Sequence, residues 1–259
     1  MEHIKVKNGE EEIMIPVPKS YADCITLIRS DYYRHTGQRL SFFKMWVKTF
    51  RNPVFRLSFW LRLAAYKGWL YYYARLRLAN VSQKYGLQIS PTCKIGYGLY
   101  IGHGFGTIIN PTAVIGNNVN LSQFTTIGSN KGKAATIGDN VYIGPSVCIV
   151  EDVCIGSNSS IGASSVVVKD VPKNVTVAGV PAKVISEKTP GRFVNRRWPL
   201  PSLFLNLPSY FYPIQNSLVE IINLELFFDG QFGNGAAIVF SSRNSPNLGP
   251  TKNSTRNAD

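Results

Sequence analysis

An apolar residue recurs at six-residue steps through the middle of the chain, and this period constrains the fold more than any other feature. The series consists of Ile89, Ile95, Ile101, Ile109, Ile115, Leu121, Ile127, Ile137, Ile143, Ile149, Ile155, Ile161 and Val167. An amphipathic helix would repeat about every 3.6 residues, and a half-buried strand about every two. The six-residue period instead indicates a parallel β-helix, in which each hexapeptide supplies one short strand and one corner.

Two steps in this series are longer than six residues. The step from Ile101 to Ile109 contains two extra residues, and the step from Ile127 to Ile137 contains four. Three hexapeptides close one coil, so the series predicts about four stacked coils. The longer steps predict loops that leave the prism, and such insertions gather on the binding face of a solenoid.

Counting through both loops predicts a column of residues along one edge of the prism. The strands that open at Ile101, Leu121, Ile143 and Ile161 are expected to share one side. Two residues into these strands lie His103, Gln123, Pro145 and Ala163. A histidine that shares an edge with a proline and a small residue suits a long, thin ligand lying parallel to the axis.

Residues 1–86 lack the six-residue period and are predicted to form an α-helical N-terminal region. The stretch "SYADCITLIRSDYYRHTG" has the serine start and glycine stop of a helix, and "NPVFRLSFWLRLAAYKGWLYYYARLRLANVSQKYG" predicts one or two more. We favour packing of these helices against the prism and against other subunits. The alternative is a basic amphipathic segment that rests peripherally on the inner face of a membrane.

The charge of the chain is strongly positive and unevenly spread. The formal net charge is +13, and no Asp or Glu occurs from residue 32 to residue 138. Such a field attracts the phosphates of a cofactor, a nucleotide-sugar, an anionic membrane or a nucleic acid. A solvated basic face without a dedicated partner explains the charge equally well.

Neither the N-terminus nor the cysteines indicate secretion. The first twenty residues are charged and contain proline, unlike a signal peptide, and no apolar run reaches the roughly 18 residues of a membrane span. The four cysteines are Cys24, Cys93, Cys148 and Cys154. The last two lie one hexapeptide apart, on adjacent faces, so we expect reduced thiols and a cytoplasmic protein.

Residues from about 81 to 185 resemble the left-handed β-helix O-acetyltransferases. The resemblance rests on "IGHGFGTIINPTAVIGNNVNLSQFTTIG", "IGASSVVVKDVP" and "AGVPAKVI", and is closest to the serine acetyltransferase and capsular polysaccharide O-acetyltransferase branch. It implies a left-handed β-helix over residues 87–185, acetyl-CoA as co-substrate and a homotrimer with active sites between subunits. Residues 186–259 would then be a C-terminal extension, which we expect to be partly disordered.

The resemblance also implies roles for individual residues. His103 matches the general base that takes a proton from the acceptor hydroxyl during direct acetyl transfer. Backbone groups around Gly128, Pro145 and Ala163 would line the pantetheine arm, whereas Lys169 and Lys183 would lie near the nucleotide phosphates. No metal is expected, because the other two histidines lie upstream of the repeat.

Four positions depart from the serine enzymes. Those enzymes carry an aspartate before the catalytic histidine, another in the preceding coil and an Arg-His pair in a later loop. Here the corresponding residues are Gly102, Gln88, Lys133 and Ala134. We therefore predict a hydroxyl of a sugar or polysaccharide precursor as the acceptor, with serine as the alternative.

The lost acids leave open what orients His103. The candidates are a backbone carbonyl or a carboxylate from outside the acid-free window, namely Asp31, Asp139, Glu151 or Asp152, from this chain or a neighbouring subunit. The rival to an enzyme is a non-catalytic solenoid that acts as a scaffold or binds a glycan. Nucleic-acid binding is not expected.

Overall fold

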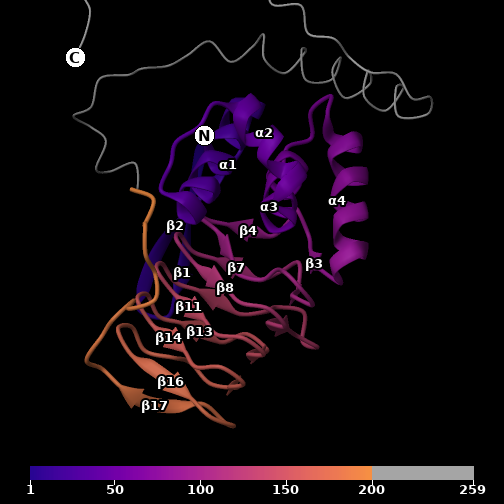
Figure 1. Ribbon diagram of the computed structural model, residues 1–259. Helices are drawn as coiled ribbons and strands as arrows, with labels where there is room; N and C mark the ends of the chain where they lie inside the picture. Colours follow the sequence, from indigo (N-terminus) through magenta and orange to yellow (C-terminus); the bar gives the residue numbers. More distant parts are fainter. Residues whose placement is uncertain (200–259) are drawn as a thin grey trace, which may run out of the picture. The chain divides into compact units, whose positions relative to one another are not determined.

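The computed structural model describes residues 1–199 of the chain. A β-hairpin comes first, followed by four helices and then the β-helix (Figure 1). The hairpin pairs β1 (Glu2–Asn8) with β2 (Glu11–Val17), and the helices are α1 (Tyr21–Thr36), α2 (Phe42–Arg51), α3 (Pro53–Leu63) and α4 (Tyr71–Tyr85). Residues 200–259, which make up most of the predicted C-terminal extension, lie outside the described part.

The repeat region consists of short strands that wind around a common axis. They are β3 (Gln88–Ile89), β4 (Lys94–Ile95), β5 (Tyr100–Ile101), β6 (Ile108–Ile109), β7 (Val114–Ile115), β8 (Asn120–Leu121), β9 (Thr126–Gly128), β10 (Thr136–Ile137), β11 (Tyr142–Ile143), β12 (Cys148–Val150), β13 (Cys154–Ile155), β14 (Ser160–Ile161), β15 (Val166–Val167), β16 (Thr176–Ala178) and β17 (Lys183–Ser186). Every third strand pairs in parallel, so three sheets form the sides of a prism. The predicted left-handed parallel β-helix of about four coils is confirmed.

The three sheets have the strand orders β4-β7-β10-β13, β5-β8-β11-β14-β16-β17 and β3-β6-β9-β12-β15. The predicted alignment of Ile101 with Leu121, Ile143 and Ile161 is confirmed by the register of the second sheet. The aliphatic side chains at the repeat positions are buried inside the prism. Burial of apolar surface between stacked coils therefore stabilises the solenoid, because no single coil could bury its own layer.

Local signals account for the helix boundaries. The side chain of Ser20 accepts a hydrogen bond from the Asp23 N–H at the start of α1, and Gly37 ends that helix with a left-handed φ of 74°. Asn52 caps α3 in the same way, one residue before Pro53. The predicted helix over residues 20–37 and two helices within residues 52–86 are confirmed. The hairpin and α2 were not predicted.

The hairpin covers the outer face of the sheet β4-β7-β10-β13. Ile13 and Ile15 of β2 pack against Val114 of β7, with partly buried side chains of β1 around them. The Asn8 amide donates a hydrogen bond of 2.9 Å to the Ile155 carbonyl, and the Ser157 N–H donates one of 3.0 Å to Glu11. The hairpin thus binds two coils together from outside.

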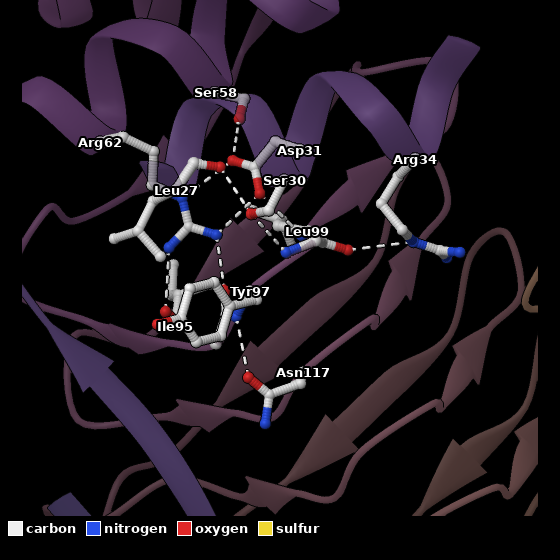
Figure 2. Close-up of polar contacts among 12 residues, drawn as sticks. Leu27, Ser30, Asp31, Arg34, Ser58, Arg62, Ile95, Tyr97, Leu99 and Asn117 are labelled. Atoms are coloured by element: carbon white, nitrogen blue, oxygen red, sulfur yellow. Dashed lines mark hydrogen bonds and ion pairs between the residues drawn. The ribbon is translucent and has the colours of Figure 1, made fainter. Parts of the chain in front are cut away.

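A buried ion pair joins the helices to the first coil (Figure 2). The Arg62 guanidinium of α3 contacts the Asp31 carboxylate of α1 at 2.8 Å, with side chains 4% and 0% exposed. Arg62 also donates to the carbonyls of Ile95 and Gly96, while Asp31 accepts the Leu99 N–H at 2.8 Å. The pair therefore satisfies backbone groups at the end of the β-helix, which would otherwise be buried without partners.

His35 at the end of α1 makes the fold sensitive to acid. Its ring lies 4.4 Å from the Tyr100 ring, and its Nε2 is buried without a hydrogen-bond partner among residues 1–199. Burial lowers the pKa of His35 to about 4, an effect that nearby Asp31 opposes and Arg34 reinforces. The unfolded chain therefore takes up a proton near pH 6.5, which the folded chain resists until about pH 4.

We expect the free energy of unfolding to fall as the pH drops from about 6.5 towards 4. The variant His35→Phe keeps an aromatic ring against Tyr100 and removes this titration, so its stability should depend less on pH in that window. Urea unfolding at pH 7, 6 and 5 measures the difference. If the free energies of unfolding of the two proteins changed equally with pH, His35 would not be buried in its neutral form.

Within the described residues, no helix is both long enough and apolar enough to cross a membrane. All four cysteines are free, and Cys148 and Cys154 lie in different sheets, as their spacing predicted. Residues 1–199 also contain no group of three His, Cys, Asp or Glu side chains that could hold a metal ion.

Candidate active site

His103 lies at the corner between the second and third sheets, here called the histidine corner. It comprises residues 102–107, 122–125, 144–147 and 162–165, which connect β5, β8, β11 and β14 to the strands that follow them. Pro145 and Ala163 stack at this corner, where the Ser164 N–H donates to the Pro145 carbonyl at 2.9 Å. The sequence therefore predicted the correct edge of the prism.

The predicted column was wrong for His103 itself. The Gly102 N–H still bonds to the Leu121 carbonyl at 2.7 Å, but the Phe124 N–H bonds to the carbonyl of Phe105 at 2.9 Å. Phe105 therefore stacks above Gln123, Pro145 and Ala163. The two extra residues of the longer step are His103 and Gly104, so the insertion carries the histidine out of the column.

The helices hold this insertion from behind. Gly104 is buried, and a Cβ built on it would lie 3.3 Å from Cγ2 of Val54 in α3. The Gly106 N–H donates to the Tyr85 carbonyl at the end of α4, at 3.1 Å. His103 itself has a left-handed φ of 50°, and its side chain is exposed. Phe124, Ser146 and Ser164 of the same corner also have a left-handed φ, so this backbone conformation recurs along the β-helix.

Among residues 1–199, no group forms a hydrogen bond with the His103 imidazole. Asp31 is held by Arg62, and Asp152 pairs with Lys133 at 2.9 Å. Asp139 accepts bonds from Asn117, and burial raises its pKa, whereas Glu151 accepts a bond from Ser129 that lowers its pKa. All four predicted carboxylates are thus engaged elsewhere in the same chain.

The five residues predicted to bind the cofactor occupy two corners. Pro145 and Ala163 share the histidine corner, and Lys183 lies at its far end, paired with Ala178 beside Gly162. Gly128 instead ends β9, and Lys169 follows β15, at the next corner across the third sheet. The Gly128 carbonyl accepts the Glu151 N–H there. The structure does not bring these two residues together with His103.

Two exposed phenylalanines flank His103, and sequence reasoning missed both. Phe105 and Phe124 are 52% and 57% exposed. Phe124 has a left-handed φ of 57°, and a Cβ built on Gly106 would lie only 2.6 Å from its ring. The Phe105 ring also contacts Tyr85 with its centroid at 5.4 Å. The signal was present, since serines occupy the positions equivalent to Phe124 in the next two coils.

A cleft of about 360 Å³ opens between α4 and the first two strands of the third sheet, β3 and β6. Arg75, Ser82, Gln88 and Ser90 supply polar groups to its lining. Gln88 stands where the serine enzymes carry an orienting aspartate, and its N–H bonds to the Thr107 carbonyl. Ser90, Pro91 and Pro111 of the lining follow β3 and β6, so the cleft reaches the corner across the third sheet from the His103 loop.

Comparisons with known proteins agree with this architecture. The family described as "Bacterial transferase hexapeptide (six repeats)" matches residues 134–169. A serine acetyltransferase of Staphylococcus epidermidis is 37% identical over 146 residues, which are 53% of this chain and 67% of that protein. A serine acetyltransferase of Bacillus pumilus is 38% identical, over 51% of this chain and 62% of that protein.

Solved structures give the same result. Serine acetyltransferase from Brucella abortus strain S19 matches with a TM-score of 0.53 at 29% identity, covering 65% of this chain and 70% of that one. The Neisseria gonorrhoeae enzyme in complex with serine matches with a TM-score of 0.53 at 31% identity, covering 62% and 69%.

The chain spans only part of these curated relatives, from 29% of the Arabidopsis thaliana mitochondrial serine acetyltransferase 3 to 67% of the Staphylococcus epidermidis protein. The family model nevertheless matches the repeat region from β10 to β15. From the repeat, the relatives and the shared fold it follows that the chain belongs to the left-handed β-helix, hexapeptide-repeat O-acetyltransferase family.

Proposed function

We propose that the protein transfers the acetyl group of acetyl-CoA to a hydroxyl group, with His103 as the general base. The observation that carries this proposal is an exposed imidazole on a loop that the helices hold from behind, at a corner whose later coils carry small residues. A Brucella abortus serine acetyltransferase of similar fold was solved in complex with coenzyme A. Ala163, Ser146 and Ser164 leave space for a narrow pantetheine arm at the corresponding corner.

The chemistry requires one base and no covalent enzyme intermediate. His103 takes the proton of the acceptor hydroxyl as that oxygen bonds to the thioester carbonyl carbon. The carbon–sulfur bond then breaks, and the departing thiolate receives the proton from the imidazolium. Direct transfer of this kind needs both substrates at the histidine corner together, which positions them for reaction.

A neighbouring subunit completes the site in this proposal. The imidazole has no orienting partner among residues 1–199, and an unoriented histidine lacks a fixed tautomer. A homotrimer would bring the corner of one subunit against a face of the next and supply a carboxylate or carbonyl. Lys183, at the end of the corner, and Lys169, across the third sheet, are exposed cations for the phosphates of coenzyme A.

The acceptor has two candidates, and the relatives favour serine. The Neisseria gonorrhoeae and soybean enzymes that share the fold were solved with serine. A sugar hydroxyl is the second candidate, favoured by the replacements at Gly102, Gln88, Lys133 and Ala134. Lys133 is engaged by Asp152, and Ala134 is fully buried, so in this chain neither is free to hold an amino acid.

Release of the coenzyme A thiol from acetyl-CoA tests the proposal. We expect release that depends on an added acceptor, with L-serine compared against a panel of free sugars and nucleotide-sugars. Turnover on L-serine would support the first candidate, and turnover on a sugar without turnover on serine would support the second. If no acceptor supports release and coenzyme A does not bind, the protein is a scaffold or a glycan-binding solenoid.

A further inference from the structure

Helix α2 carries an apolar stripe that nothing in residues 1–199 covers. One face of the helix, with Met45 and Trp46, is buried against the neighbouring helices. Phe43, Val47 and Phe50 lie on a different face, and they are 46%, 43% and 56% exposed. Their spacing of four and then three residues aligns them along one side of the helix. The apolar side of α2 is therefore wider than the part that the core covers.

A row of cations runs beside this stripe. Lys44, Lys48 and Arg51 repeat the same spacing one position further on, and all three are exposed. The Arg56 guanidinium adds a fourth cation at the end of the helix, where it donates to the carbonyls of Thr49 and Phe50. No Asp or Glu occurs from residue 32 to residue 138 to neutralise these charges. Aromatic and aliphatic side chains thus lie next to uncompensated positive charge.

We propose that the α2 stripe rests on an anionic lipid bilayer. Helices bind in the plane of a membrane surface when bulky apolar side chains enter the acyl boundary and flanking cations meet acidic headgroups. Phe43 and Phe50 supply the rings, which lean on Trp46 with centroids at 5.7 and 5.1 Å. The helix lies at the opposite end of the described residues from β17, so the prism projects away from the surface it binds (Figure 1).

Charge argues against a symmetric contact between the α2 stripes of two copies as the occupant. A symmetric contact between two α2 stripes would bring both rows of cations together, with no carboxylate from residues 32–138 between them. Like charges in such a contact repel and disfavour association. An acidic bilayer supplies the opposite charge over a wide, flat area and needs no shaped groove. This inference does not depend on the proposed acetyl transfer.

Sedimentation of the full chain with lipid vesicles tests the inference. We expect binding to vesicles of phosphatidylcholine with phosphatidylglycerol, at least tenfold weaker binding to phosphatidylcholine alone, and release as salt rises from 0.1 to about 0.5 M. Replacing Phe43→Ser and Phe50→Ser together should weaken binding at least tenfold. Ile185→Ser is the matched control, since Ile185 is 64% exposed on β17 at the far end.

Two outcomes would overturn the inference. One is equal binding of the wild type and the double variant to phosphatidylglycerol vesicles, with both proteins showing the same thermal unfolding midpoint. The other is unchanged vesicle binding together with a smaller assembly of the double variant in solution, which would make the stripe an interface between copies. The double variant Lys44→Gln, Lys48→Gln leaves the stripe intact and should still bind phosphatidylglycerol vesicles more weakly than the wild type. This variant separates the attraction to anionic lipid from general damage to the fold.

Discussion

Replacement of His103 by Asn is expected to lower the rate of acetyl transfer by about 10²–10⁴-fold, the usual contribution of a positioned general base. Asparagine tolerates the left-handed φ of 50° at this position, so the loop should keep its shape. Its amide cannot accept the proton of the acceptor hydroxyl. Turnover is measured by thiol release, and binding of coenzyme A by calorimetry should remain close to that of the wild type.

A second histidine variant separates loss of the base from loss of the fold. His3 in β1 lies 3.0 Å from the Tyr97 hydroxyl, in the hairpin rather than at the histidine corner. His3→Asn should therefore retain turnover within about twofold of the wild type, because it removes only a structural contact. If His103→Asn turned over as fast as His3→Asn, another group would have to be the base.

The repeat made most of the fold predictable. A six-residue period reflects aliphatic side chains that all point into the prism. The positions of the strands and their order around the prism were therefore predictable from the spacing alone. The alignment of Ile101 with Leu121 is an example, although a loop of unknown shape separates them. The ends of α1 were also predictable from nearby residues, because Ser20 and Gly37 form hydrogen bonds with backbone groups in the first and last turns of that helix.

The position of His103 within its corner was not predictable in this way. Spacing shows that the step after Ile101 holds two extra residues, but not which two leave the prism. Packing of Gly104 against Val54 and bonding of Gly106 to Tyr85 decide that, and both partners come from the helices. The same holds for Asp31, one of the four carboxylates considered as partners of His103, because its pairing with Arg62 depends on how α1 packs against α3.

The missed hairpin did have a signal in the sequence. Gly9 opens a two-residue loop between two alternating apolar stretches, "HIKVKNGEEEIMIPV", and a glycine at this position indicates paired strands. Gly9 adopts the left-handed φ of 62° that such a turn requires. Helix α2 also had a signal in the sequence, since its apolar residues share one side of the helix and Lys44, Lys48 and Arg51 lie on the other.

Replacement of Arg62 by Met is expected to destabilise the protein by about 3–5 kcal/mol, because it leaves the buried Asp31 carboxylate without its partner. It also removes the donors that reach the carbonyls of Ile95 and Gly96 at the end of the β-helix. Urea unfolding at pH 7 measures the loss. Adding Asp31→Leu removes the unpaired buried charge and should recover part of the lost stability. The carbonyls of Ile95 and Gly96 would stay unpaired.

An ion pair at the surface supplies the matched control. Lys133 and Asp152 are 2.9 Å apart, as close as the buried pair, but their side chains are 64% and 46% exposed. Water and salt screen that contact, so Lys133→Met should cost less than about 1 kcal/mol. A cost for Arg62→Met no larger than that would mean that the helices and the β-helix unfold independently. A cost several times larger would show that they form one cooperative unit, and that the helices behind Gly104 are able to hold His103 in place.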